Sequence, residues 1–369
     1  MNLRNHLGWL IVLALTLLSI VSRLKFNGLI LDFDYGIYQP DGSHYSYRTL
    51  TMLGIDSNVA ANRVVEWYQV HGIKNNSINP SQLTPSNTEI WRLVSPRILY
   101  SLLSVPFVYF MGLSGMMVIP VLSYSLLVFS VYRLSEIRNR PVIGLILVAA
   151  ITTSPTVLRW MIANITDSLL TGLFALTVLF IAKNYSGTAW ILYMVILICL
   201  TSATRFCLPI WIGISFVYFL NKMKIQGLTI LLTSTFAFIP ALLAFPAVPL
   251  IPASSDAQEV KKLLQLPISF VRVGFIEIAQ LAVLDRLLLM LLVIAVFISI
   301  IYWREMSSQF FLSVSFCAWL IGAINPVLGV NLRYQLPIIG FACLAIVSNL
   351  KSFTDWIAWR RIHIVGKKT

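Results

Sequence analysis

The chain has 369 residues, of which 58% are hydrophobic and only 11% are charged. Soluble globular domains carry roughly 25% charged residues, so this composition excludes an ordinary soluble domain and predicts an all-α polytopic membrane protein. The net charge of +13 does not indicate nucleic-acid binding, because the basic residues are not gathered on a soluble domain and cationic ends beside apolar spans are attracted to anionic lipid headgroups.

Apolar runs predict about ten transmembrane helices, because about 20 apolar residues cross the hydrocarbon core of a bilayer. The first run follows Arg4 and resembles an uncleaved signal anchor, since no small-residue cleavage site comes after it. The predicted spans lie at 7–22, 115–132, 142–159, 167–182, 189–204, 206–220, 228–250, 286–302, 310–324 and 335–350.

Basic residues in the short loops predict the orientation, because cytoplasmic loops are enriched in lysine and arginine. Three arginines lie at 133–140, two lysines at 222–224, and further basic residues in the tail at 351–369. All three segments fall on one side of the membrane if both termini are cytoplasmic. The chain is then a single transmembrane domain over 1–369 with a cytoplasmic tail.

Two long loops face outward in this arrangement. The first, at 23–114, is expected to be structured, and it contains an apolar stretch at 97–113 that would invert the charge pattern if it crossed the membrane. We therefore predict a helix at 92–112 that lies in or partly enters the outer interface. The second sizeable loop, at 251–285, contains a similar segment at 258–280, where basic residues alternate with apolar ones.

Carboxylates and arginines gather on the outer side of this topology. Ionisable groups held against apolar membrane segments are costly and therefore indicate a functional site. Tyr45 follows Asp41 at helical spacing, so the two side chains would share one helix face. The candidate site residues are Asp41, Tyr45, Asp167, Arg205, Arg333 and Tyr334.

Each candidate also has a purely structural interpretation. Asp41 lies in a Pro-Asp-Gly triplet that favours a turn. Asp167 with Thr166 could cap a helix. Arg205 and Arg333 could anchor the chain at the outer interface.

Four short motifs carry a family resemblance. They are Asp41-x-x-x-Tyr45, the stretch from Thr153-Ser-Pro to Thr166-Asp-Ser-Leu169, Ser202-Ala-Thr-Arg205, and Arg333-Tyr-Gln-Leu-Pro337. In their order and common sidedness they resemble the GT-C glycosyltransferases, such as the protein mannosyltransferase and aminoarabinose transferase relatives.

The resemblance implies a GT-C-like fold and an inverting transfer of a sugar from a polyprenyl-phosphate-linked donor to an acceptor at the outer face. Asp41 would be the general base that takes the acceptor proton, and Asp167 the second catalytic residue. Arginines would hold the phosphate oxygens through charge-assisted hydrogen bonds. The implied substrate-binding residues are Tyr45, Arg205, Arg333 and Tyr334.

No cofactor is expected, because the four cysteines and four histidines show no metal-ligand spacing. The chain has no glycine-rich phosphate loop, so a lipid-linked sugar rather than a sugar nucleotide is expected as the donor. A divalent metal is left open. The expected partners are the lipid-linked donor, membrane lipids, and a glycan, lipid or protein acceptor. The acceptor is left open, since Asp41 lacks the adjacent second acid of the protein mannosyltransferases, and the sequence does not indicate which sugar is moved. The expected location is a bacterial inner membrane, with the site facing the periplasm.

Two other function classes stay open. An O-antigen-type polysaccharide polymerase is also polytopic with outer arginines, although its large loop usually comes late in the chain. A lipid or glycan transporter (flippase) would place charges in mid-span and repeat broken helices in two halves, whereas most predicted span interiors here lack charge.

Overall fold

The protein is described here as a computed structural model. It describes residues 3–25, 39–71, 78–84, 94–183, 187–244, 266–324 and 332–350, and every regular element in these ranges is a helix. The helices are α1 (Leu3–Lys25), α2 (Pro40–Met52), α3 (Ser57–His71), α4 (Pro80–Leu83), α6 (Ile98–Met111), η1 (Gly112–Met117), α7 (Val118–Ile137), α8 (Pro141–Thr153), α9 (Pro155–Met161), α10 (Thr166–Ala182), α11 (Gly187–Ser202), α12 (Leu208–Leu220), α13 (Lys224–Ala237), α14 (Ile239–Ala244), α16 (Leu266–Leu284), α17 (Arg286–Ile301), α18 (Met306–Ile324), α19 (Leu332–Gln335) and an unlabelled helix at Ile338–Leu350.

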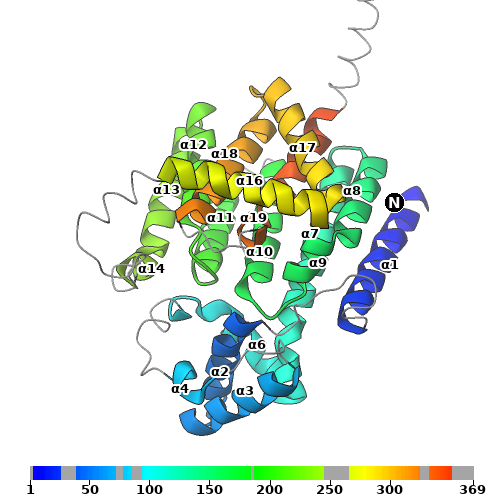
Figure 1. Cartoon of the computed structure of the whole chain (residues 1–369). Helices are drawn as coiled ribbons and strands as arrows, with labels where there is room; N and C mark the ends of the chain where they lie inside the picture. Colours follow the sequence, from blue (N-terminus) through cyan, green and yellow to red (C-terminus); the bar gives the residue numbers. More distant parts are fainter. Residues whose placement is uncertain are drawn as a thin grey trace, which may run out of the picture.

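The helices form a bundle with a second, smaller layer at one end (Figure 1). Helices α7, α8, α10, α11, α12, α13 and α18 build the bundle, and α1 stands at its edge. Helices α2, α3, α4 and α6 form the layer below the bundle, and α16 runs crosswise over one side of it. Because α16 does not run along the bundle, we do not treat it as a membrane-spanning helix.

Helix α10 is the centre of the bundle, since most of its residues are buried. Its neighbour α7 comes so close at Gly172 that a β-carbon there would lie 3.1 Å from the backbone oxygen of Ser123. Phe174 contacts both Trp211 of α12 and Phe341 of the last helix, with ring centroids 5.3 and 6.3 Å apart. The first turn of α10, which carries Asp167, is therefore held rigidly at the lower end of the bundle.

Membrane-spanning character is supported by helix length and composition. Among the described residues, His6–Leu24 and Ile98–Ile137 are long and apolar enough to cross a membrane. A third span results if the bent pair α8 and α9 is counted as one, and seven further apolar helices have 10–17 residues. The described part of the chain is all-helical, and several of its helices are compatible with a membrane. That the chain crosses the membrane ten times stays a prediction.

The predicted span at 142–159 corresponds to two helices with a bend between them. The chain breaks at Ser154, and α8 and α9 meet at a bend of 69°. Pro155 explains the break, because proline disfavours helical backbone in the residue before it and lacks an N–H for the helix ladder. Asp285 stabilises the bend: its carboxylate accepts hydrogen bonds from the Ser154 hydroxyl, from the Thr156 N–H at 3.0 Å and from the Leu288 N–H at 3.0 Å.

The predicted span at 228–250 is also interrupted. Helix α13 ends at Ala237, α14 covers only Ile239–Ala244, and residues 245–265 lie outside the described part of the chain. The predicted helix at 258–280 exists as α16, from Leu266 onward.

The predicted helix at 92–112 corresponds to α6, which begins at Ile98. It has 14 residues, or about 21 Å at 1.5 Å per residue, which is less than the roughly 30 Å hydrocarbon core. The chain turns at Gly112, whose φ is +63°, and the Tyr100 hydroxyl donates to the Met116 carbonyl at 2.8 Å. The apolar stretch Ile98–Ile137 is therefore folded back on itself at its start. Its placement in the interface stays a prediction.

Candidate functional site

Asp41 lies in the first turn of α2, directly below the bundle. Gln39 precedes the helix, and its backbone N–H donates to the Asn164 side-chain oxygen at 2.7 Å. A β-carbon on Gly42 would overlap the side chain and the backbone of Asn164, so only glycine permits this close approach. The Pro-Asp-Gly triplet thus begins a helix rather than forming an isolated turn, and it is clamped to the segment between α9 and α10.

Arg333 forms an ion pair with Asp41 at 2.7 Å, across 292 residues of sequence. The Asp41 side chain is 54% accessible and the Arg333 side chain 13%. Burial is nevertheless the largest influence on the Asp41 pKa, and it opposes ionisation; the charges of Arg333, Arg205 and Arg97 together outweigh it and lower the pKa. Asp41 is therefore an ionised carboxylate whose side chain is accessible to solvent.

Arg205 forms the second ion pair, with Asp167. Both side chains are buried, at 8% and 3% accessible, and Arg205 lies in the turn between α11 and α12. The interpretation of Arg205 as an interface anchor is therefore wrong. The capping interpretation of Asp167 is wrong as well, because Ile165 is the N-cap and no side chain caps α10. Asp167 instead lies in the first turn, where the helix dipole favours a carboxylate.

Arg97 joins the two ion pairs, and sequence reasoning missed it. Two hydrogen bonds hold the start of α6 in place. The Leu99 N–H donates to the Ala203 carbonyl at 3.0 Å, and the Ser101 hydroxyl donates to the Tyr45 carbonyl at 3.2 Å. Burial disfavours the charge of Arg97, but Tyr45 and the carboxylates of Asp167 and Asp41 outweigh it and raise the pKa. Its position directly before an apolar run was the signal available in the sequence.

Tyr45 supports this arginine. Its ring is buried edge-on against Tyr100, with centroids 5.6 Å apart, and its hydroxyl accepts a hydrogen bond from Nη1 of Arg97 at 3.3 Å. The helical spacing predicted for Asp41 and Tyr45 is confirmed, since both lie on α2. The side chain of Tyr334 lies outside the described residues.

His44, one turn after Asp41, is a second residue that sequence reasoning missed. Its Nδ1 is buried without a hydrogen-bond partner. Burial lowers its pKa and the nearby Asp41 carboxylate only partly opposes this, so the imidazole is neutral at pH 7. It adds a polar group to the site without adding charge.

The cluster carries an excess of positive charge. Two carboxylates, Asp41 and Asp167, face three guanidinium groups, Arg97, Arg205 and Arg333. These residues come from five separate segments of the chain. Among the described residues of this cluster, guanidinium groups therefore outnumber carboxylates by three to two, and such a balance suits an anionic ligand.

No known protein family has a model that matches this chain, and no curated protein matches it. Within the described ranges, no group of three or more His, Cys, Asp or Glu side chains is placed to hold a metal ion.

Proposed function

We propose that this chain is an integral membrane glycosyltransferase that moves a sugar from a polyprenyl-phosphate-linked donor to an acceptor, with inversion and with Asp41 as general base. The observation that carries the proposal is the cationic cluster around one accessible carboxylate. Arginine guanidinium groups bind phosphate oxygens in bidentate geometry, and a carboxylate beside the departing phosphate is suited to take the acceptor proton. The acceptor would be a glycolipid, a polysaccharide or a protein.

The Asp41–Arg333 pair supports an order of events. While Arg333 holds the carboxylate, the lowered pKa makes Asp41 a weak base. A donor phosphate that reaches the accessible Asp41–Arg333 pair would compete for the same guanidinium. Its arrival would detach Arg333 from Asp41, raise the basicity of the carboxylate, and so activate the base only when the donor is bound.

Asp167 and Arg205 have a different role in this proposal. Both are buried and paired with each other, so neither is free to exchange partners with a ligand. Arg205 lowers the pKa of Asp41, and Asp167 stabilises Arg97. The pair would therefore hold the charge pattern of the site, with Arg97 and Arg333 as the groups that meet the donor phosphate.

The decisive experiment is transfer by the purified protein in lipid nanodiscs. Polyprenyl phosphates carrying different sugars would be offered with candidate acceptors, and products followed by mass spectrometry. We expect transfer with at least one lipid-linked sugar, and none with the corresponding sugar nucleotide. The proposal fails if lipid-linked donors bind with the same affinity to the protein and to its Arg333→Ala variant and no sugar is released.

The cellular counterpart is mass analysis of lipid-linked glycans after loss of the gene. We propose a bacterial inner membrane with a periplasmic site, so that an unused polyprenyl-phosphate sugar should accumulate. The accumulated lipid would identify the donor sugar directly.

A transporter of lipids or glycans is the second candidate, and the break between α8 and α9 favours it. Interrupted helices with polar groups at the break are typical of transporter binding sites, and here Ser154, Thr156 and Asp285 meet at the bend. A transporter would move the lipid-linked sugar across a vesicle membrane without cleaving it. Intact lipid recovered from the opposite leaflet separates this activity from transfer.

A further inference from the structure

Glu277 and Gln335 form an isolated polar pair between α16 and α19. Both side chains are buried, and Glu277 is 2% exposed. Their one hydrogen bond runs from Nε2 of Gln335 to Oε1 of Glu277 at 3.4 Å. The other oxygen of each group, Oε2 of Glu277 and Oε1 of Gln335, is buried without a partner.

This pattern is unfavourable for an ionised glutamate. A carboxylate offers only acceptors, and the amide oxygen of glutamine is also an acceptor. A buried charge without compensating partners costs far more than a neutral group. One proton on Oε2 removes both problems, because Oε2 becomes a donor and Gln335 Oε1 is an unused acceptor on the same partner. The two groups would then share two hydrogen bonds.

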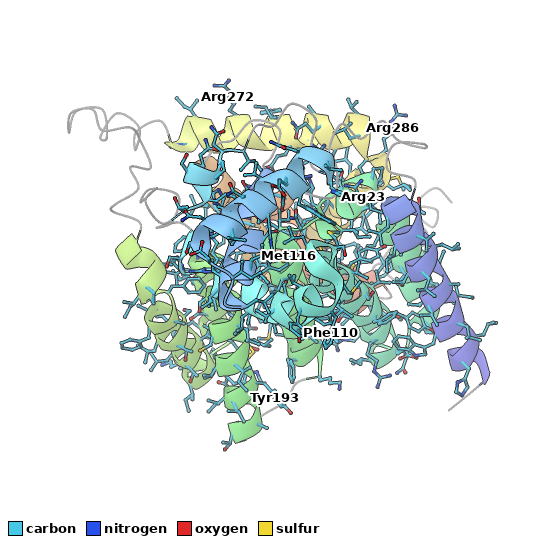
Figure 2. All side chains as sticks on the ribbon, turned by 90° about the horizontal axis from the view of Figure 1, so that it is seen from below. Arg23, Phe110, Met116, Tyr193, Arg272 and Arg286 are labelled. Carbon is cyan, nitrogen blue, oxygen red and sulfur yellow. The ribbon has the colours of Figure 1, made fainter. Side chains whose placement is uncertain are left out.

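In the part of the chain that the structure describes, no charge favours ionisation of Glu277, since burial and the hydrogen bond from Gln335 are the influences on its pKa. Helix α18 has no charged residue. Burial raises the pKa of Glu277 to about 7, and the hydrogen bond from Gln335 is the opposing influence. Arg272 on α16 and Arg286 on α17 point outward (Figure 2). Arg159 of α9 lies over the Trp160 ring at 4.8 Å. Asp285 accepts three hydrogen bonds, and Arg333 of α19 binds Asp41.

The pair lies next to the candidate site in the chain. Helix α19 has only four residues, and so short a helix is not stable by itself. Leu332 and Leu336 are buried on either side, and Gln335 ties the helix to α16. Arg333, two residues before Gln335, reaches Asp41 from this same short helix.

We infer that Glu277 carries a proton in the working protein, and that the resulting acid–amide pair with Gln335 holds α19 in the position from which Arg333 reaches Asp41. Glu277 is thus a positioning residue for Arg333. The presence of the proton is independent of the proposed function, whereas its effect on donor binding rests on that function.

Infrared spectroscopy tests the proton directly. In the purified protein at about pH 6, a protonated carboxyl C=O band should be present that is absent from Glu277→Gln, and it should disappear near pH 9. Glu66→Gln is the matched control, because Glu66 is an exposed acid of α3 and its removal should leave the band unchanged. Identical spectra for the protein and Glu277→Gln at about pH 6 would overturn the inference.

Binding of an unglycosylated polyprenyl phosphate in nanodiscs tests the positioning role. The amide of Glu277→Gln can make both hydrogen bonds without an added proton, so the affinity of this variant for the lipid should not change with pH. The affinity of the unaltered protein for the lipid should fall as pH rises through about 7. Glu277→Leu should bind about tenfold or more weakly at every pH, as expected when a charge-assisted contact is lost. Equal pH dependence in the unaltered protein and Glu277→Gln would overturn the positioning role.

Thermal unfolding separates this inference from the proposed function. If the lipid binds to no version of the protein, the proposed function fails, but the proton still affects stability. Because the pKa is raised on folding, the stabilising contribution is present below the ordinary value of 4.5 and is lost as pH rises to about 7. The unfolding temperature of the unaltered protein should fall over this window relative to that of Glu277→Gln. A constant difference would contradict the inference.

Discussion

The two ion pairs of the candidate site have the same chemistry and opposite surroundings. Arg205 and Asp167 are both buried, whereas Asp41 in the other pair is 54% accessible. A buried pair is costly to break, because either partner alone is left as an unpaired charge. A pair with one accessible partner, such as Asp41 beside the 13% accessible Arg333, is easier to separate than a fully buried pair and can exchange with a ligand. The buried Arg205–Asp167 pair therefore has a structural role, and the Asp41–Arg333 pair is the one that can exchange with a ligand.

Breaking the buried pair should have the largest effect. Asp167→Asn or Arg205→Gln should destabilise the protein by about 3–5 kcal/mol, since one uncompensated buried charge or dipole remains. The unfolding temperature in detergent and the yield of folded protein measure this. Arg133→Ala is the matched control, because its pair with Glu136 is 51% accessible on the arginine side. Single variants as stable as this control would contradict the assignment.

Removing the accessible carboxylate should affect transfer rather than stability. Asp41→Asn keeps the side-chain size but loses the basic oxygen, so turnover should fall about 10²-fold or more, while the unfolding temperature changes little. Glu66→Gln, an exposed acid in the same layer, should keep normal turnover. Near-normal turnover by Asp41→Asn would assign the base to another group, and the neutral His44 is the first to test.

Arg333 should contribute phosphate affinity that does not depend on the sugar. Arg333→Ala should weaken donor binding about tenfold or more, and Arg333→Lys less, because lysine keeps the charge but lacks the planar fork. Affinities for two lipids with different sugars measure this, with Arg63→Ala as the control, because Arg63 is an exposed arginine of α3. A deficit for only one sugar would assign Arg333 to sugar recognition.

The smallest effect concerns acid pH. The pKa of Asp41 is lowered on folding, so its stabilising contribution is present above the ordinary value of 3.8 and is lost only as pH falls below it. The difference in unfolding temperature between the unaltered protein and Asp41→Asn should therefore stay constant from about pH 8 to pH 5. A difference that shrinks within this range would show that Arg333 does not hold the carboxylate ionised.

The sequence by itself determined the helical class and the apolar character of the chain. Both follow from local composition, because apolar side chains partition out of water wherever they stand. The helical spacing of Asp41 and Tyr45 was predictable for the same reason, since a periodicity of 3.6 residues needs no distant partner. The break near Ser154 could also have been predicted, from Pro155 alone.

Only the tertiary structure decided which of these groups meet. Asp41 and Arg333 are 292 residues apart, and the local sequence around either residue does not predict that the other is its partner. Arg97 and Glu277 gain their significance from burial beside specific partners, Tyr45 and Gln335. The physical reason is that a charge pair depends on distance and desolvation, and both are set by how distant helices pack rather than by the residues that flank the charge.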